Sequence, residues 1–334
     1  MNYAVNPKTD HWKIYPMKEA MEAIQVKDLQ DGSTTDFDLY IEAGERLVLY
    51  AKAPYAWTHG ELERLLADKH QALYYSTADR VLVDTYRLVH SRIVIDESLP
   101  PPVRIARLTD AAAELTRILY AQPLTTAALG RVGDIAQAMV TCVETDPTCI
   151  RALGKLANHD HYTYYHSARV AAYALAIALK LTSRETTQLT EMTTGALLHD
   201  IGKSRIDLAV LNKAGPLTPD EWVLMKEHPV HGGAIVADSL LSVVPRSIIL
   251  QHHERFDGSG YPHQLSEREL LDEVKIASFA DVFDALTTNR PYHESRTPFE
   301  ALDFIRHKLL KNLHKDSFRA MTQLLGVETL KKSG

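Results

Sequence analysis

The chain contains 334 residues, which is enough for two domains or for one large domain with a smaller attachment. Apolar residues make up 45% and charged residues 24%, as is ordinary for a globular protein. The formal net charge of −6 gives no overall attraction for polyanions and argues against bulk nucleic-acid binding, so a phosphate-bearing ligand would need local charge from a metal or a few basic residues.

The low cysteine count and the lack of a recognisable targeting or membrane-spanning segment favour a cytoplasmic protein with no membrane association. The two cysteines, Cys142 and Cys149, cannot build a disulfide framework and are expected to be reduced thiols. Residues 1–16 lack the basic-then-apolar order of a signal peptide. The most apolar run, Ala171 to Leu181, is too short to span a bilayer and contains Lys180.

The first 99 residues are expected to form a small α/β module. Residues 37–41 and 47–50 alternate in polarity around the turn at 42–45, which predicts a β-hairpin. A capping box at Thr58 to Glu61 predicts a helix from Glu61 to Lys69, and it is followed by a strand at Ala72–Tyr75 and a helix at about Asp79–His90. The histidines of this module are scattered, so we expect no ligand cluster, and a regulatory or dimerising role rests on its position alone.

The proline run at Leu99–Pro102 marks the predicted boundary, and the rest of the chain has helical periodicity. We expect a helical domain over residues 103–330, made of a helical linker at 103–145 and a catalytic core at 146–330. The predicted helices are Val103–Tyr120, Thr125–Cys142, Tyr164–Lys180, Ser183–His199, Pro219–His228, Val230–Ser239, Pro245–His253, Glu273–Thr287, Pro298–Leu313 and Asp316–Leu325.

Seven histidines and aspartates stand in or at the ends of these apolar helices, where imidazoles and carboxylates cost free energy unless something binds them. Each alone has a structural explanation, such as a hydrogen-bonded core histidine for His166 or a helix-capping role for His228. Together they favour a metal site in the bundle core, and seven ligands are too many for one zinc ion. Without a thiolate they suit two divalent ions, iron or manganese, with zinc, cobalt or nickel as alternatives. The candidate ligands are His166, His199, Asp200, His228, His252, His253 and Asp281.

Four motifs in this region resemble those of the HD-GYP family of cyclic di-GMP phosphodiesterases, and the resemblance covers about residues 125–325. They are HDIGK at His199–Lys203, KEHP at Lys226–Pro229, HHERFDGSGYP at His252–Pro262 and ADVFDALTTNRPY at Ala280–Tyr292. The implied fold class is α+β but mainly α, with an all-helical HD-GYP bundle behind the small N-terminal module. The family has a two- or three-metal centre.

The resemblance also implies how the ligands divide between metals. His166, His199, Asp200 and Asp281 correspond to the ligands of one metal, and His228, His252 and His253 to those of the second, with Asp200 shared. Three-metal members have a glutamate one helical turn before the first histidine, where this chain has Tyr162. A phenol is a poor ligand for a hard divalent ion, so two metals are expected.

The expected reaction is hydrolysis of cyclic di-GMP to linear pGpG, GMP or both, by a hydroxide that bridges the two metals. Lys203 corresponds to a family lysine that holds a phosphoryl oxygen, and Arg290 is the expected second phosphate clamp. Asp257 and Tyr261, in the glycine-rich turn, could contact the substrate or be purely structural. Through this GYP loop the family could contact other signalling proteins, and a homodimer is left open. The alternatives are a low-turnover cyclic dinucleotide sensor or partner-docking module, and a general HD nucleotidase.

Overall fold

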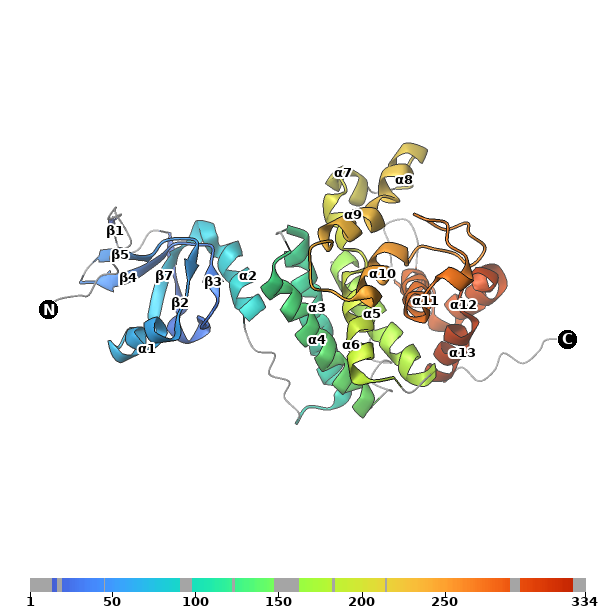
Figure 1. Cartoon of the computed structure of the whole chain (residues 1–334), viewed down its shortest axis with the longest axis horizontal. Helices are drawn as coiled ribbons and strands as arrows, with labels where there is room; N and C mark the ends of the chain where they lie inside the picture. The colour runs from blue at the N-terminus through green and yellow to red at the C-terminus, as the bar shows by residue number, and fades with distance from the viewer. Residues whose placement is uncertain are drawn as a thin grey trace. The chain divides into compact units, whose positions relative to one another are not determined.

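The computed structural model describes residues 14–16, 20–44, 46–90, 98–121, 124–146, 162–181, 184–213, 215–288 and 295–326. The chain forms two compact units, Met1–Arg92 and Ile93–Gly334, which divide shortly before the proline run (Figure 1). The roles predicted for the separate domains stay predictions.

The N-terminal unit contains a five-stranded sheet whose strand pairs are antiparallel, in the order β1-β5-β4-β7-β2. The predicted hairpin is confirmed: β4 pairs with β5, and Ala43 lies opposite Arg46. Gly44 in the turn has a φ of +65°, which a residue without a Cβ adopts at little cost. The strands are β1 (Ile14–Pro16), β2 (Met21–Gln25), β4 (Leu39–Ala43), β5 (Arg46–Ala51) and β7 (Ala72–Ser76), with a separate pair formed by β3 (Thr34–Thr35) and β6 (Tyr55–Ala56).

Two helices accompany the sheet, α1 (His59–Ala67) and α2 (Arg80–His90). The predicted capping box is present, because Glu61 Oε2 accepts hydrogen bonds from the backbone N–H and the hydroxyl of Thr58. Helix α1 therefore begins directly after Thr58, two residues earlier than expected. The core between sheet and helices includes the fully buried Trp57 and Leu73. Strands β1, β2, β3 and β6 were not predicted.

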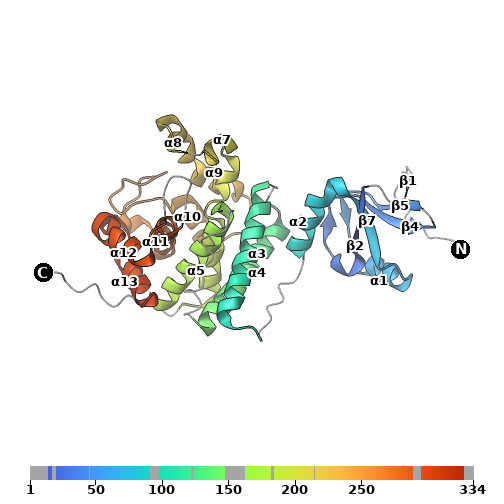
Figure 2. The same ribbon diagram turned by 180° about the vertical axis from the view of Figure 1, so that it is seen from behind.

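The second unit is a helical bundle in which α5 (Tyr162–Leu181) lies at the centre (Figure 2). Helix α5 is rich in alanine and almost fully buried, so neighbouring helices pack closely on all sides of it. It contacts α3 (Pro101–Ala121), α6 (Thr186–Leu198), α11 (Asp272–Thr287) and α13 (Lys315–Leu324), while α4 (Thr126–Thr145) and α10 (Val243–Gln251) pack on α6. A mainly helical chain with a small N-terminal module is confirmed.

Several boundaries differ from the predicted ones. His228 begins α9 (His228–Ile235) instead of ending the preceding helix, and Pro229 is accommodated in the first turn, where its missing N–H leaves no bond unmade. The preceding helix, α8 (Pro219–Met225), ends before His228. The last predicted long helix is interrupted: α12 (Pro298–Phe304) continues as a π-helical turn at Ile305–Leu309.

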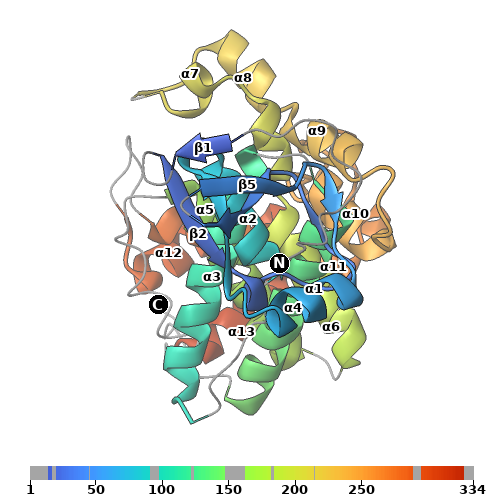
Figure 3. The same ribbon diagram turned by 90° about the vertical axis from the view of Figure 1, so that its left-hand side faces the viewer.

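Two short elements between α6 and α8 were not predicted. They are the 3₁₀ helix η4 (Ile201–Arg205) and α7 (Leu208–Leu211). Helices α7 and α8 project from the bundle (Figure 3). Among the described residues, no helix combines the length and the apolar character that crossing a membrane would require.

Candidate metal centre

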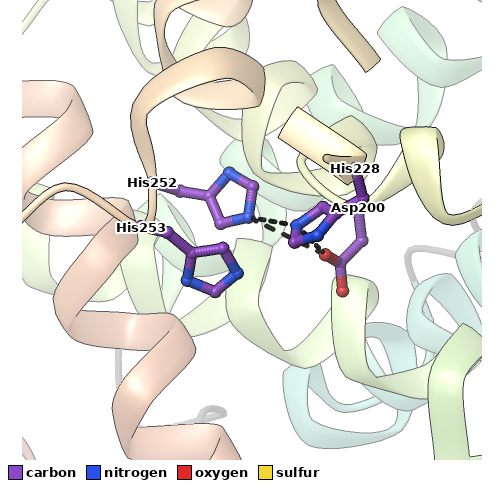
Figure 4. A group of neighbouring side chains, drawn as sticks. All are labelled: Asp200, His228, His252 and His253. Carbon is purple, nitrogen blue, oxygen red and sulfur yellow. Dashed lines mark hydrogen bonds and ion pairs between the residues drawn. The ribbon is translucent and has the colours of Figure 1, made fainter. Parts of the chain in front are cut away.

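Asp200, at the junction of α6 and η4, lies at the centre of the candidate site. Its Oδ1 atom is 3.2 Å from His228 Nε2 and 3.8 Å from His252 Nε2. These two imidazoles come from the start of α9 and the end of α10, and their Nε2 atoms are 3.1 Å apart. His253 completes the group, and its ring centroid lies 5.0 Å from that of His228 (Figure 4).

A second group lies on the other side of the Asp200 carboxylate. Asp200 Oδ2 is 3.3 Å from His199 Nε2 and 3.7 Å from His166 Nε2. His166 Nε2 is also 3.2 Å from Asp281 Oδ1, which connects α5 to α11. The structure therefore brings all seven predicted ligands together as two adjacent sets that could each hold a metal ion, with Asp200 in contact with both.

Hydrogen bonds at Nδ1 direct four of the imidazoles inward. A backbone carbonyl can only accept, so Nδ1 carries the proton wherever it faces one, and Nε2 is left with its lone pair. This tautomer allows Nε2 to bind a metal. The bonds are His199 to Ala196 O (2.8 Å), His228 to Met225 O (2.7 Å), His252 to Ile248 O (3.0 Å) and Ile249 O (3.1 Å), and His166 to the carboxylate of Asp284 (2.7 Å).

The electrostatics of the site also suit a cation. Burial, together with repulsion from His199 and His228, lowers the pKa of His252 well below its usual value, so this imidazole is neutral and can coordinate. Burial alone would raise the pKa of Asp200, but His199 and Lys203 outweigh it and hold that pKa well below the usual range. Burial likewise lowers the pKa of His253, whereas at His199 the Asp200 carboxylate outweighs burial and raises the pKa.

Two buried polar atoms at the centre lack a partner with hydrogen-bond geometry among the described residues. They are His199 Nε2 and Asp200 Oδ1. An unsatisfied polar atom in a protein interior costs about 1–3 kcal/mol. Both atoms belong to the predicted ligand set, so a bound cation would satisfy them, and the residues fit the metal centre that the sequence predicted.

Behind His166, a buried group fixes the ring in place. The carboxylate of Asp284, on α11, accepts a hydrogen bond from His166 Nδ1. It also accepts hydrogen bonds from Arg169 Nε at 2.6 Å and from Arg169 Nη2 at 3.0 Å. Arg169 Nη2 bonds Thr288 Oγ1 at 3.1 Å as well. Arg169 balances the charge of Asp284, and Asp284 orients His166. Sequence reasoning assigned no role to these residues, although an arginine three residues after His166 on an alanine-rich helix is a signal.

The glycine-rich loop after His253 is held by Glu254, which is almost fully buried. Glu254 Oε1 accepts from the backbone N–H of His263 at 2.7 Å, and Oε2 accepts from that of Leu265 at 3.0 Å. A Cβ at Gly260 would collide with the backbone of Glu254, so only glycine fits this close approach. Sequence reasoning gave Glu254 no role beyond its place in the motif.

The two loop residues proposed as substrate contacts have different environments. Asp257 Oδ1 accepts from the backbone N–H of Ser259 at 3.1 Å and from its hydroxyl at 2.6 Å, which is a structural arrangement within the loop. The Tyr261 ring lies 4.8 Å from that of His253 and therefore borders the candidate centre. A contact with substrate is open to Tyr261 and stays a prediction for both.

Lys203, on η4, also borders the centre. Its Nζ atom lies 2.5 Å from Asp200 Oδ2, and its side chain keeps 20% of its surface exposed. Part of the Lys203 side chain is therefore open to solvent. Arg290 and the side chain of Tyr162 lie outside the described residues.

At Gly202 the backbones of η4 and α9 lie close together, and replacement of this glycine by alanine should displace His228. An added Cβ would overlap the carbonyl oxygen of His228 and the backbone nitrogen of Gly232. We expect Gly202→Ala to cost about 3 kcal/mol or more of unfolding free energy, measured by chemical denaturation, and to weaken metal binding. Gly130→Ala is the control: its Cβ meets nothing within 4 Å in α4, so it should stabilise the chain by about 0.5–1 kcal/mol. A neutral effect of Gly202→Ala would contradict the close packing.

Comparison with known proteins supports this assignment of the site. A family model described as an HD domain matches residues 154–314. The motifs His199-Asp200 and Gly260-Tyr261-Pro262 are those of the HD-GYP branch, and the predicted resemblance to that branch is confirmed.

Relatives and a solved structure give further context. The chain is 34% identical over 197 residues to a cyclic di-GMP phosphodiesterase of Pseudomonas aeruginosa, a match that covers 58% of this chain and 47% of the relative. It is 32% identical over 198 residues to the 3′3′-cGAMP-specific phosphodiesterase 3 of Vibrio cholerae, which covers 58% and 42%. The chain thus spans less than half the length of these relatives. The solved structure of Bd1817, an HDG"Y"P protein from Bdellovibrio bacteriovorus, shares the fold with a TM-score of 0.62 at 21% identity, over 92% of this chain and 99% of that one.

Proposed function

We propose that this chain is a metal-dependent phosphodiesterase that hydrolyses cyclic di-GMP to linear pGpG, GMP or both. The observation that carries the proposal is the pair of buried ligand sets in contact with one carboxylate, Asp200. Relatives named as phosphodiesterases of cyclic di-GMP and of 3′3′-cGAMP support a cyclic dinucleotide as the substrate class.

The proposed cofactor is a pair of divalent cations, iron or manganese, because the ligand sets contain imidazole and carboxylate but no thiolate. His166, His199 and Asp281 would hold one, and His228, His252 and His253 the other, with Asp200 between them. When bound, such a pair lowers the pKa of a coordinated water and neutralises charge on a phosphoryl group. Zinc, cobalt and nickel are the alternatives.

The chain's own residues would orient the phosphodiester and exclude water. Lys203 is the proposed donor to a non-bridging phosphoryl oxygen, since its side chain is partly exposed and its ammonium group lies beside Asp200. Tyr261 lies against His253 and would form one wall of the substrate site. The ligand side chains are mostly buried, so the low-dielectric surroundings strengthen every charge interaction with a bound phosphate.

The test is a turnover assay on protein purified without oxygen and loaded with iron or manganese. Separate reactions receive cyclic di-GMP, 3′3′-cGAMP and a deoxynucleoside triphosphate, and the products are separated by chromatography. The proposal expects linear pGpG or GMP from cyclic di-GMP. If only 3′3′-cGAMP were hydrolysed, that compound and not cyclic di-GMP would be the substrate. Cleavage of the triphosphate alone would indicate a nucleotidase, and binding without turnover would indicate a sensor.

Lys203→Gln should lower kcat on cyclic di-GMP about a hundredfold while both cations remain bound. The glutamine keeps hydrogen-bonding capacity but loses the positive charge beside the phosphate, and charged donors of this kind are worth about 10²–10³ in rate. Metal content is measured together with the kinetics. Lys213→Gln is the control, because the Lys213 ammonium forms an ion pair with Glu221 on α8 and, within the part of the chain that the structure describes, with none of the proposed ligands. Equal rates for Lys203→Gln and wild type would remove Lys203 from the proposed site.

A further inference from the structure

The main-chain carbonyl of Asp200 accepts two hydrogen bonds, and one of them comes from outside the HD domain. The backbone N–H of Lys203 donates to Asp200 O at 2.9 Å, as the 3₁₀ turn of η4 requires. The hydroxyl of Tyr120 donates to the same oxygen at 2.7 Å. Tyr120 lies in the last turn of α3, more than thirty residues before the segment 154–314 that matches the family model.

Tyr120 is held firmly in this position. Its ring packs edge-on against that of Tyr164 with centroids 5.6 Å apart, and Tyr164 stands two residues before His166 on α5. Helix α3 packs against both α5 and η4. Burial and the nearby charge of Asp200 raise the pKa of Tyr120 well above its usual value, so the hydroxyl keeps its proton and acts as the donor.

We propose that Tyr120 is a positioning residue for the candidate metal centre. Its hydroxyl fixes the Asp200 peptide and thereby the directions of the Asp200 carboxylate and of Lys203. A carbonyl that is engaged by two donors cannot tilt without losing a bond. The Asp200 carboxylate must face His199 with one oxygen and His228 with the other, and such an arrangement tolerates little rotation of its peptide.

This assignment gives α3 a part in the chemistry of a site whose ligands lie in other helices. Helix α3 is also the first helix that follows the N-terminal unit along the chain. The HD domain alone would therefore lack one of the two donors to the Asp200 carbonyl. The turnover readout of this inference rests on the proposed function, whereas its metal-binding readout does not.

The test compares Tyr120→Phe with Tyr165→Phe. The first removes the hydroxyl and keeps the ring that packs on Tyr164. The control also removes a hydroxyl between α5 and α3, since Tyr165 donates to Asp110 Oδ1 at 3.0 Å, but that bond does not involve Asp200. Mn²⁺ affinity of the metal-free full chain is measured by equilibrium dialysis, kcat on cyclic di-GMP is measured after loading, and unfolding is followed by circular dichroism.

Tyr120→Phe should bind Mn²⁺ about tenfold more weakly and turn over about tenfold more slowly, as expected for loss of a group that supports a ligand. Tyr165→Phe should stay within about twofold of wild type in both, although each variant loses one hydroxyl hydrogen bond and should be destabilised to a similar extent. Equal Mn²⁺ affinities of the two variants would overturn the proposal. If the wild-type chain binds Mn²⁺ but hydrolyses no cyclic dinucleotide, the proposed function fails, and the Mn²⁺ affinities still decide the role of Tyr120.

Discussion

Replacing Asp200 by asparagine should abolish loading of at least one cation and reduce turnover of cyclic di-GMP about a thousandfold or more. A thousandfold loss corresponds to about 4 kcal/mol of transition-state stabilisation. The reason is that Asp200 contacts both ligand sets, with one oxygen 3.2 Å from His228 Nε2 and the other 3.3 Å from His199 Nε2. An amide has nearly the same shape as the carboxylate, but it has no charge and only one acceptor oxygen.

The measurement pairs metal analysis with single-turnover kinetics. Asp303→Asn is the control, because Asp303 on α12 also contacts a histidine, His307 at 3.3 Å in the following π-helical turn, but both side chains are exposed. We expect this control to bind the same amount of metal as wild type and to retain its rate. Two bound cations together with a rate within tenfold of wild type in Asp200→Asn would refute the shared-carboxylate arrangement.

The ligands could be recognised in the sequence because their chemistry conflicts with their surroundings. His199-Asp200 follows a run of buried apolar residues in α6, and His252-His253 follows another in α10. A polar group in such a place needs a compensating partner, and several of them together favour metal. The helical periods also placed these side chains at the ends of helices, where they converge.

The residues that support the ligands could not be paired from the sequence. Asp284 contacts Arg169 across 115 positions, and Tyr120 contacts Asp200 across 80. Helical periodicity says which face of a helix is buried, but it does not say which helix covers that face or in what register. These contacts depend on how α3, α5 and α11 pack, and packing is a property of the folded chain.

Helix boundaries were misplaced where two local sequence rules give different predictions. A proline usually ends a helix at the preceding residue, which is why His228 was expected at a helix end, yet proline is equally suited to a first turn. In the N-terminal unit, the short strands β1 and β2 lie at the two edges of the sheet. Each pairs with one neighbouring strand, and this pairing orders segments whose alternation of apolar and polar residues is too weak to predict a strand.

Asp284→Ala should destabilise the chain by about 3–5 kcal/mol, because it leaves the guanidinium of Arg169 buried without its carboxylate. The double variant Arg169→Met, Asp284→Leu replaces both charges with apolar groups of similar size. It should recover most of this loss, since removing a whole buried ion pair is often neutral whereas breaking one is not. Free energies of unfolding from chemical denaturation of the metal-free chain check both values.

Metal affinity separates the two roles of Asp284. His166 loses its Nδ1 acceptor in the single and in the double variant, so both should bind Mn²⁺ about 10–100-fold more weakly even where stability returns. Asp316→Ala is the matched control: it breaks an exposed Asp–Arg pair with Arg319 on α13 and should change stability by no more than about 1 kcal/mol and leave Mn²⁺ affinity unchanged. If the double variant regained Mn²⁺ affinity along with stability, Asp284 would serve only to neutralise Arg169, and the orientation of His166 would have to come from the packing of α5 against α11.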